Sequence, residues 1–173
     1  MADLRSLIRD IPDFPKKGIL FKDITPLLAD PSGLSECISQ MAARVTRPEA
    51  VVAVESRGFI FGTGLALHWK VPLVPARKFG KLPGKTVRQV YSLEYGEDTL
   101  ELHADALRPG QRVVVVDDLL ATGGTAEATA RLVEQLGSSV EALLFVIELE
   151  GLGGSARLAP RRVEALMRFE VRE

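Results

Sequence analysis

The sequence predicts an α/β protein with a Rossmann-like, mainly parallel sheet flanked by helices. Two short apolar runs, residues 50–54 and 113–116, are typical of central strands buried on both faces. Helical periodicity follows or precedes them at residues 33–45, 59–69 and 126–136. Strands that alternate with helices in this way indicate parallel pairing through right-handed crossovers.

Length and composition agree with one globular domain. The chain has 173 residues, 46% of them hydrophobic and 26% charged, so residues 1–173 can build a single domain with a full core. A net charge of −1 with no long charge run gives no reason to expect a nucleic-acid partner. No apolar run is long enough to span a bilayer, and the N-terminus lacks the apolar core of a signal peptide. We expect a cytoplasmic protein without a membrane partner.

The first half of the chain begins with a short helix at residues 2–9. Residues 10–27 are proline-rich, and we expect them to be irregular and extended. After the first strand and the helix at 59–69, residues 72–75 form a short strand. Residues 76–87 combine glycines, a proline and several basic residues with little to bury, which is typical of a mobile loop. We call residues 76–87 the lid segment.

The second half begins with alternating residues at 90–94 and 98–103, which predict a hairpin around the intervening turn. The run at 113–116 and the helix at 126–136 follow, and the helix ends before Gly137. Residues 140–148 then form the last central strand, and residues 151–154 a flexible turn. The single cysteine, Cys37, lies in a helical pattern and is expected to be a core residue.

Residues 113–125, Val-Val-Val-Val-Asp-Asp-Leu-Leu-Ala-Thr-Gly-Gly-Thr, carry the chemistry of the chain. The glycines let the backbone approach a ligand closely, and the N-terminus of the next helix attracts an anion. Asp117 and Asp118 would repel that anion, so they suit the hydroxyls of an attached sugar or a metal ion. The segment therefore predicts a site for a sugar phosphate.

Two other kinds of phosphate site do not fit this segment. No Gly-Lys-Ser/Thr follows the glycines, which excludes a Walker A loop. A receiver-type phosphoacceptor site would need acids near the first strand and a lysine after the last strand, and neither is evident. Paired glycines after a strand can also be an ordinary turn, but a buried strand, two acids, glycines and a helix in this order rarely coincide without a ligand.

The segment resembles the phosphoribosyl pyrophosphate motif of the type I phosphoribosyltransferases. Further segments are similar to the adenine-specific members of that family. They are Ile11–Pro15, Gly18–Leu27, Glu55–Phe59, Arg77–Gly84 and Tyr91–Gly96, and with the motif they cover nearly the whole chain. The resemblance implies the type I phosphoribosyltransferase fold, with about residues 1–30 as a small hood over the base. It also implies transfer of the phosphoribosyl group to N9 of adenine, which gives AMP and pyrophosphate.

The resemblance assigns site residues by their place in these motifs. The residues expected to bind the phosphoribosyl group and AMP are Asp117, Asp118, Ala121, Thr122, Gly123, Gly124 and Thr125. The residues expected to bind pyrophosphate are Ser56, Arg57, Arg77, Lys78 and Lys81, with Arg57 and Lys81 also acting in catalysis. The residues expected at adenine are Leu20 and Lys22, through their backbones, and Phe21 and Leu149, on the two ring faces.

Glu94 is the expected acid/base, because a carboxylate near the imidazole edge of adenine can accept the N9 proton. Mg²⁺ is the implied cofactor, bound mostly by substrate oxygens and water, with no dedicated protein ligands. We expect the lid segment to exclude water from the reaction. We also expect a homodimer, since Arg77 resembles a residue that reaches the partner's site.

Two other functions remain open from the sequence. The first is a phosphoribosyltransferase for another purine base, such as hypoxanthine or guanine. The second is a regulator that binds phosphoribosyl pyrophosphate without turning it over. A regulator of this kind would be expected to carry a DNA-binding segment and to lack the lid segment.

Overall fold

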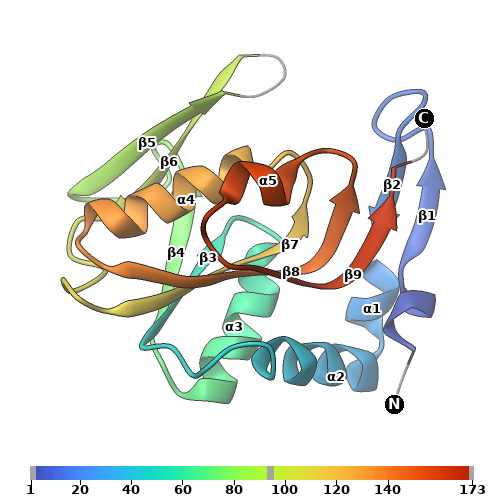
Figure 1. Ribbon diagram of the computed structural model, residues 1–173, viewed down its shortest axis with the longest axis horizontal. Coiled ribbons are helices and arrows are strands. Elements are labelled where there is room, and N and C mark those ends of the chain that lie inside the picture. Colours follow the sequence, from blue (N-terminus) through green and yellow to red (C-terminus); the bar gives the residue numbers. More distant parts are fainter. Residues whose placement is uncertain (1–2, 93–95, 172–173) are drawn as a thin grey trace.

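The computed structural model describes residues 3–92 and 96–171 and contains a seven-stranded sheet in the order β5-β6-β4-β3-β7-β8-β9 (Figure 1). The strands of this sheet are β3 (Ala50–Val54), β4 (Leu73–Lys78), β5 (Thr86–Ser92), β6 (Glu97–His103), β7 (Arg112–Leu120), β8 (Ser139–Glu150) and β9 (Val163–Glu170). The helices are η1 (Leu4–Leu7), α1 (Thr25–Ala29), α2 (Pro31–Ala42), α3 (Gly58–Trp69), α4 (Gly124–Gln135) and α5 (Gly154–Leu158).

The sheet is parallel from β4 to β9 and antiparallel at its other edge. Strand β3 pairs in parallel with both β4 and β7, and β8 pairs in parallel with β7 and β9. Strand β6 pairs antiparallel with β4 and β5. The predicted α/β class with a mainly parallel sheet is confirmed. Parallel order brings the carboxyl ends of β3, β4 and β7 to the same edge of the sheet, where α/β proteins bind their ligands.

Helices cover both faces of the sheet (Figure 1). On one face, α4 packs over alternate valines of β7, such as Val113 and Val115. On the other face, α2 and α3 pack over Val114 and Val116. The run of valines is therefore buried on both sides, as the sequence predicts, and Cys37 is fully buried in the second cluster.

The prediction of irregular structure across residues 10–27 is wrong. Strand β1 (Arg9–Pro12) and strand β2 (Leu20–Asp23) form a separate antiparallel pair, and α1 follows with a proline in its first turn. The two strands satisfy each other's backbone groups, and proline is tolerated at a strand end and in a first helical turn. The predicted helix at residues 2–9 is shorter than expected, since η1 has only four residues.

Two further predictions need correction, and one strand is absent from the sequence-based prediction. The lid segment is not irregular throughout, because β4 runs to Lys78 and β5 begins at Thr86, which leaves residues 79–85 as the β4–β5 loop. Strand β8 is the last central strand, as predicted, and the strand that the sequence does not indicate is β9, which pairs with β8 at the edge of the sheet. The predicted turn at 151–154 leads into α5, which begins at Gly154. Edge strands and one-turn helices have little periodicity, which explains why the sequence does not indicate them.

No helix in the described part of the chain is both long and apolar enough to cross a membrane.

Candidate functional site

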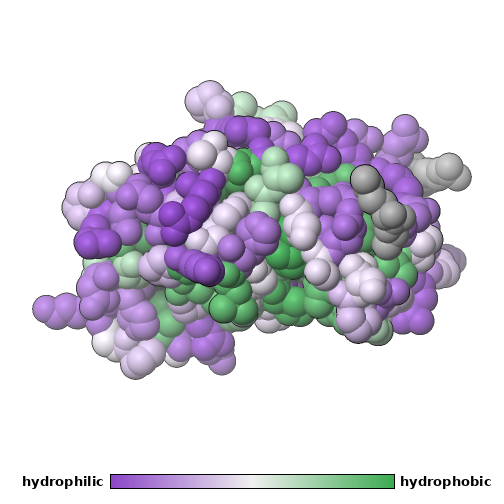
Figure 2. Space-filling model, turned by 90° about the horizontal axis from the view of Figure 1, so that it is seen from below, coloured by the Kyte–Doolittle hydropathy of each residue, from purple (hydrophilic) through white to green (hydrophobic). Residues whose placement is uncertain are grey.

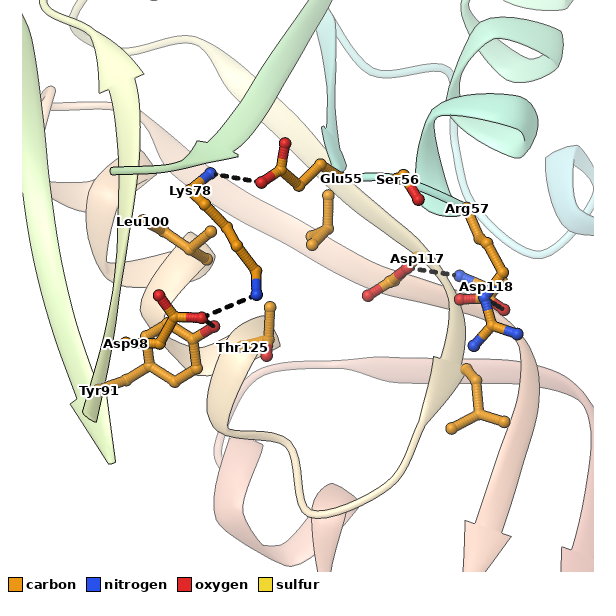
Figure 3. A pocket seen from close by; sticks show the side chains of 12 residues that line it. Glu55, Ser56, Arg57, Lys78, Tyr91, Asp98, Leu100, Asp117, Asp118 and Thr125 are labelled. Carbon is orange, nitrogen blue, oxygen red and sulfur yellow. Dashed lines mark hydrogen bonds and ion pairs between the residues drawn. The ribbon is translucent and has the colours of Figure 1, made fainter. Parts of the chain in front are cut away.

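A cavity of about 300 Å³ lies at the carboxyl ends of β3, β4 and β7 (Figure 3). Most of its lining is polar, and positive and negative side chains face each other across it. The residues that line it are Val54, Glu55, Ser56, Arg57, Lys78, Tyr91, Asp98, Leu100, Asp117, Asp118, Leu119 and Thr125. Six of these were predicted as site residues from the sequence, and the fold brings them together from three separate segments.

Residues 121–125, which the sequence predicts to bind a phosphate and which we call the phosphate loop, connect β7 to α4 beside this cavity. It surrounds a smaller pocket that Asp117 also lines, so the two spaces adjoin. Gly123 has φ +82°, a conformation that favours glycine, and α4 begins at Gly124. Because the first backbone N–H groups of a helix have no intrahelical partner, this loop can bind an anion.

Helix α5 packs directly against the back of the phosphate loop. A side chain on Gly123 would approach the Gly154 carbonyl oxygen to 3.0 Å. A side chain on Gly154 would overlap the Ala121 carbonyl oxygen and the Leu120 side chain. Two glycines in backbone contact therefore set the distance between the loop and α5.

Asp117 and Asp118 lie within β7, which ends at Leu120, whereas the sequence predicts them directly after a strand. Arg57 Nε lies 3.0 Å from Oδ2 of Asp118, yet this oxygen accepts no well-aligned hydrogen bond. Burial and the neighbouring Asp118 carboxylate raise the pKa of Asp117 well above its ordinary value. Burial also raises the pKa of Asp118, although the charge of Arg57 opposes the rise. Two adjacent carboxyls with raised pKa values are typical of a binding site rather than of a solvated turn.

Ser56 and Arg57 follow β3 and lead into α3. Helix α3 can approach β7 closely because its first residue is glycine. A side chain on Gly58 would lie 2.9 Å from both the Val116 carbonyl oxygen and Oδ1 of Asp117. This packing places Arg57 beside the two aspartates, as Figure 3 shows.

Glu55, for which the sequence predicts no role, organises the end of β4. Its carboxylate accepts hydrogen bonds from Nε of Arg77 at 2.9 Å and from the backbone N–H of Lys78 at 2.8 Å. The Lys78 side chain extends into the cavity, where its Nζ lies 3.1 Å from Oδ2 of Asp98 (Figure 3). Of the predicted pyrophosphate residues, Ser56, Arg57 and Lys78 therefore line one cavity.

Two other predicted pyrophosphate residues lie outside this cavity. Arg77 is turned toward Glu55 and donates to the Lys81 carbonyl oxygen at 3.4 Å. Lys81 is exposed on the β4–β5 loop. That loop is attached to β6, because the backbone N–H of Gly80 donates to the buried carboxylate of Glu101 at 2.9 Å. Glu94, the predicted acid/base, lies outside the described residues.

The predicted adenine residues lie on β2 and β8. The ring of Phe21 lies under Arg57, with 5.4 Å from the guanidinium carbon to the ring centroid, and packs edge-on against Phe14 at 5.1 Å. Leu149 lies near the end of β8 and packs against the core on the side of α2 and α3. Phe21 is thus in contact with Arg57, which lines the cavity.

Leu20 and Lys22 line a different hollow, together with Phe169. The Lys22 side chain is buried and pairs with Asp10 at 2.6 Å, so it is unavailable to a ligand in the cavity. The sequence assigns both residues to adenine through their backbones, and that role is not affected by where the side chains lie.

Tyr91 and Asp98 also line the cavity, and the sequence does not single them out as site residues. Both lie on the β5–β6 hairpin, directly opposite each other in its register. Tyr91 is inside a recognised motif, which could have indicated it. The sequence around Asp98 does not distinguish it from other carboxylates in hairpins. Its place in the cavity depends on how the hairpin packs against the rest of the sheet.

The site has limited means to bind a metal ion by itself. Within residues 3–92 and 96–171, no three metal-ligating side chains converge. Oδ2 of Asp118, buried without a hydrogen-bond donor, is an oxygen that a cation or a sugar hydroxyl could satisfy. These residues fit a hydrated cation that a phosphorylated ligand brings with it.

Comparison with known proteins places this fold and site in a family. A model of the phosphoribosyl transferase domain matches residues 27–158. The adenine phosphoribosyltransferase of Carboxydothermus hydrogenoformans is 53% identical over 169 residues, which are 96% of this chain and 99% of that protein. The adenine phosphoribosyltransferase of a Synechococcus species is 56% identical over 170 residues, again 96% and 99% of the two chains.

Solved structures agree in the whole fold. The adenine phosphoribosyltransferase of Thermoanaerobacter pseudethanolicus superposes with a TM-score of 0.93 at 48% identity and covers 96% of this chain and 98% of its own. The enzyme from Saccharomyces cerevisiae, solved with an imino-altritol bisphosphate and adenine, has a TM-score of 0.88 at 38% identity, covering 95% and 97%. By sequence, by fold and by the phosphate loop that joins β7 to α4, the chain belongs to the adenine phosphoribosyltransferases.

Proposed function

We propose that this site transfers the 5-phosphoribosyl group from phosphoribosyl pyrophosphate to N9 of adenine, releasing pyrophosphate and AMP in purine salvage. One observation carries the proposal. The phosphate loop surrounds a small pocket, and this pocket shares Asp117, Leu119 and Thr125 with the adjoining cavity that Ser56, Arg57 and Lys78 line. A substrate with a phosphate at one end of a ribose and a pyrophosphate at the other fits this arrangement.

The ribose would lie over β7. The 5-phosphate would accept hydrogen bonds from the backbone of the phosphate loop and from Thr122 and Thr125. Ionised Asp117 and Asp118 would accept hydrogen bonds from the ribose hydroxyls, each about twice as strong as a neutral one. The pKa values of both carboxyls are raised because burial deprives them of water molecules as hydrogen-bond donors, and ribose hydroxyls would supply such donors. A second anion would supply none, so the pair supports a site for a sugar hydroxyl.

The pyrophosphate would lie toward β3 and β4. Ser56, Arg57 and Lys78 would meet its oxygens, and Lys81 and Arg77 would join them from the β4–β5 loop or from a partner subunit. As the bond at C1 lengthens, positive charge develops on the ribose and negative charge on the leaving group. Cations positioned for the leaving group stabilise this state more than the ground state. Mg²⁺, when bound to the pyrophosphate, would supply further neutralisation of its charge.

Adenine would enter from the hood. Phe21, already beside Arg57, would stack on one face of the base, and Leu149 would cover the other. The backbone groups of Leu20 and Lys22 would read its polar edge. Glu94 would accept the N9 proton as the base attacks C1 from the side opposite the pyrophosphate, inverting that carbon.

We further propose a single domain from residue 1 to 173 that acts as a cytoplasmic homodimer. Helix α3 is apolar around most of its surface, and neither the sheet nor α2 covers all of it. Ile60, Leu67 and Leu73 remain exposed, Leu67 by 73%. Figure 2 shows apolar surface on the face that α2 and α3 form. An exposed apolar face on a small domain commonly marks an interface.

The assay offers each purine base separately with phosphoribosyl pyrophosphate and Mg²⁺ and detects the nucleotide formed. We expect adenine to be preferred over hypoxanthine and guanine by at least about 100-fold in kcat/KM, because an oxo-purine would leave buried polar groups unpaired. Comparable use of hypoxanthine would identify a different base specificity. Binding of phosphoribosyl pyrophosphate without turnover of any base would identify the non-catalytic regulator instead.

A further inference from the structure

Each of three cations near the cavity is paired with a carboxylate of this chain. Arg57 pairs with Asp118 at 3.0 Å, Arg77 pairs with Glu55 at 2.9 Å, and Lys78 pairs with Asp98 at 3.1 Å. Glu55 also accepts a hydrogen bond from the Lys78 backbone at the end of β4, and Asp118 is expected to bind ribose. Asp98 is different, because it lies outside the motifs that the sequence predicts to bind the substrate.

Asp98 lies in a small network that spans the cavity. Its Oδ2 accepts a hydrogen bond from the Tyr91 hydroxyl at 3.3 Å as well as the ion pair from Lys78, and its Oδ1 accepts from the backbone N–H of Thr99 at 2.8 Å. Thr125 of the phosphate loop lines the same cavity as Tyr91. The network therefore connects the end of β4 to the β5–β6 hairpin at the edge of the cavity that the phosphate loop also reaches (Figure 3).

Both members of the ion pair are charged at neutral pH. The hydrogen bond to Asp98 raises the pKa of the Lys78 ammonium. Burial raises the pKa of Asp98, but hydrogen bonds from Thr99 and Lys78 outweigh it and the net shift is downward. The side chains are 58% and 22% exposed, so Lys78 can leave the carboxylate at modest cost.

A carboxylate at this position opposes the ligand that the site is proposed to bind. A pyrophosphate that meets Lys78 must displace Asp98 from the ammonium, and the freed carboxylate then repels it across the same cavity. Both effects lower the affinity for pyrophosphate.

We propose that Asp98 competes with pyrophosphate for Lys78, so that it holds the ammonium when pyrophosphate is absent, weakens pyrophosphate binding and speeds its release. Asp98 is in this view a positioning residue that acts through Lys78. The inference rests on the proposed function, because it requires that Lys78 meet the pyrophosphate.

The test is the variant Asp98→Asn, which keeps the shape of the side chain and removes its charge. We expect the inhibition constant of inorganic pyrophosphate, measured as a product inhibitor of AMP formation, to fall by about three- to tenfold. The dissociation constant of AMP should change by less than about twofold, because AMP has no group that meets Lys78. A chase experiment should show slower release of labelled pyrophosphate.

The double variant Lys78→Met with Asp98→Asn provides the specific control. Without Lys78, removing the Asp98 charge should change the inhibition constant by much less than it does in the presence of Lys78, and this coupling would not arise from a general loss of structure. Glu134→Gln is the matched control for charge. It removes one negative charge from a surface pair with Arg161, on α4 and outside the residues that line the cavity, and should leave pyrophosphate inhibition unchanged.

Thermal unfolding checks that each variant is folded. Unchanged or weaker pyrophosphate inhibition in folded Asp98→Asn, or a fall of equal size without Lys78, would overturn the inference. If Lys78→Met alone leaves pyrophosphate inhibition unchanged, Lys78 does not meet pyrophosphate and the inference fails with that assignment, while adenine turnover would still support the transferase itself. Absence of turnover with every base in the wild-type protein would refute the proposed function directly.

Discussion

Arg57 and Asp118 form an ion pair in which Nε lies 3.0 Å from Oδ2, although that oxygen has no aligned hydrogen-bond donor. One residue precedes α3 and the other lies near the end of β7, and the guanidinium also covers the ring of Phe21. This contact joins the three parts of the site that the sequence predicts separately: the pyrophosphate end, the ribose end and the base end. A ligand that satisfies Asp118 would act on all three.

Replacement of Asp117 or Asp118 by alanine should weaken phosphoribosyl pyrophosphate and AMP together. Both ligands present ribose hydroxyls, and each lost charge-assisted hydrogen bond should cost about 1.5–3 kcal/mol. Calorimetry with the two ligands measures the change. Unchanged affinity for both in a folded variant would mean that these aspartates do not bind the ribose.

Asp117→Asn should make the ligand-free protein more stable at neutral pH. The pKa of Asp117 is raised on folding, so its contribution to stability is present below the unfolded pKa of about 3.9 and is lost as pH rises through the folded value. At pH 7, which is above the unfolded pKa, burial of this carboxyl therefore costs stability, and asparagine removes the cost.

Thermal unfolding at several pH values tests the sign. The midpoint of Asp117→Asn should exceed that of the wild type at pH 7–8, and the difference should shrink toward pH 4. A variant that is less stable than the wild type at pH 7 would show that the Asp117 charge is well compensated without ligand.

Gly154→Ala should impair binding of the 5-phosphate although Gly154 is outside the phosphate loop. The new methyl group would overlap the Ala121 carbonyl oxygen and the Leu120 side chain, so the loop or α5 must move. We expect at least about tenfold weaker AMP binding, since small displacements of positioned groups are costly. Leu158→Ala, which loosens α5 without crowding the loop, is the comparison, and an equal loss of AMP affinity in both would argue against the steric mechanism.

Deletion of residues 79–84 should lower kcat far more than it raises the dissociation constant of AMP, because AMP lacks the pyrophosphate that this segment would cover. The deletion also removes the Gly80 N–H from the buried carboxylate of Glu101, which could destabilise the hairpin. Lys81→Met avoids this problem and should show the same pattern more weakly. Full kcat in both variants would refute the role of a lid.

Arg77 should act in the site of a partner subunit. The test mixes Arg77→Ala with Glu94→Gln and allows the subunits to exchange. If Arg77 acts in trans, each heterodimer regains one intact site in two, and the mixture exceeds both parents in activity. No recovery after verified exchange would assign Arg77 to its own chain, where its contact with Glu55 would be its main role.

The sequence by itself determined the central part of this protein. Valines 113–116 must be buried on both faces, and glycines 123 and 124 must form a close turn before a helix. These features depend on local propensity and periodicity, and the structure has them as predicted, although β7 extends past Asp117 and Asp118 to Leu120. The α/β class follows from the same local patterns.

Only the tertiary structure decided which polar residues share the cavity. Asp98 and Tyr91 line it because the β5–β6 hairpin lies over the carboxyl ends of the sheet, and Glu55 matters because it meets Arg77 from another strand. The short strands β1 and β2 are stabilised by pairing with each other, and β9 by pairing with β8, so their own sequences indicate little. Long-range pairing and charge contacts are properties of the packed chain, and local periodicity carries no record of them.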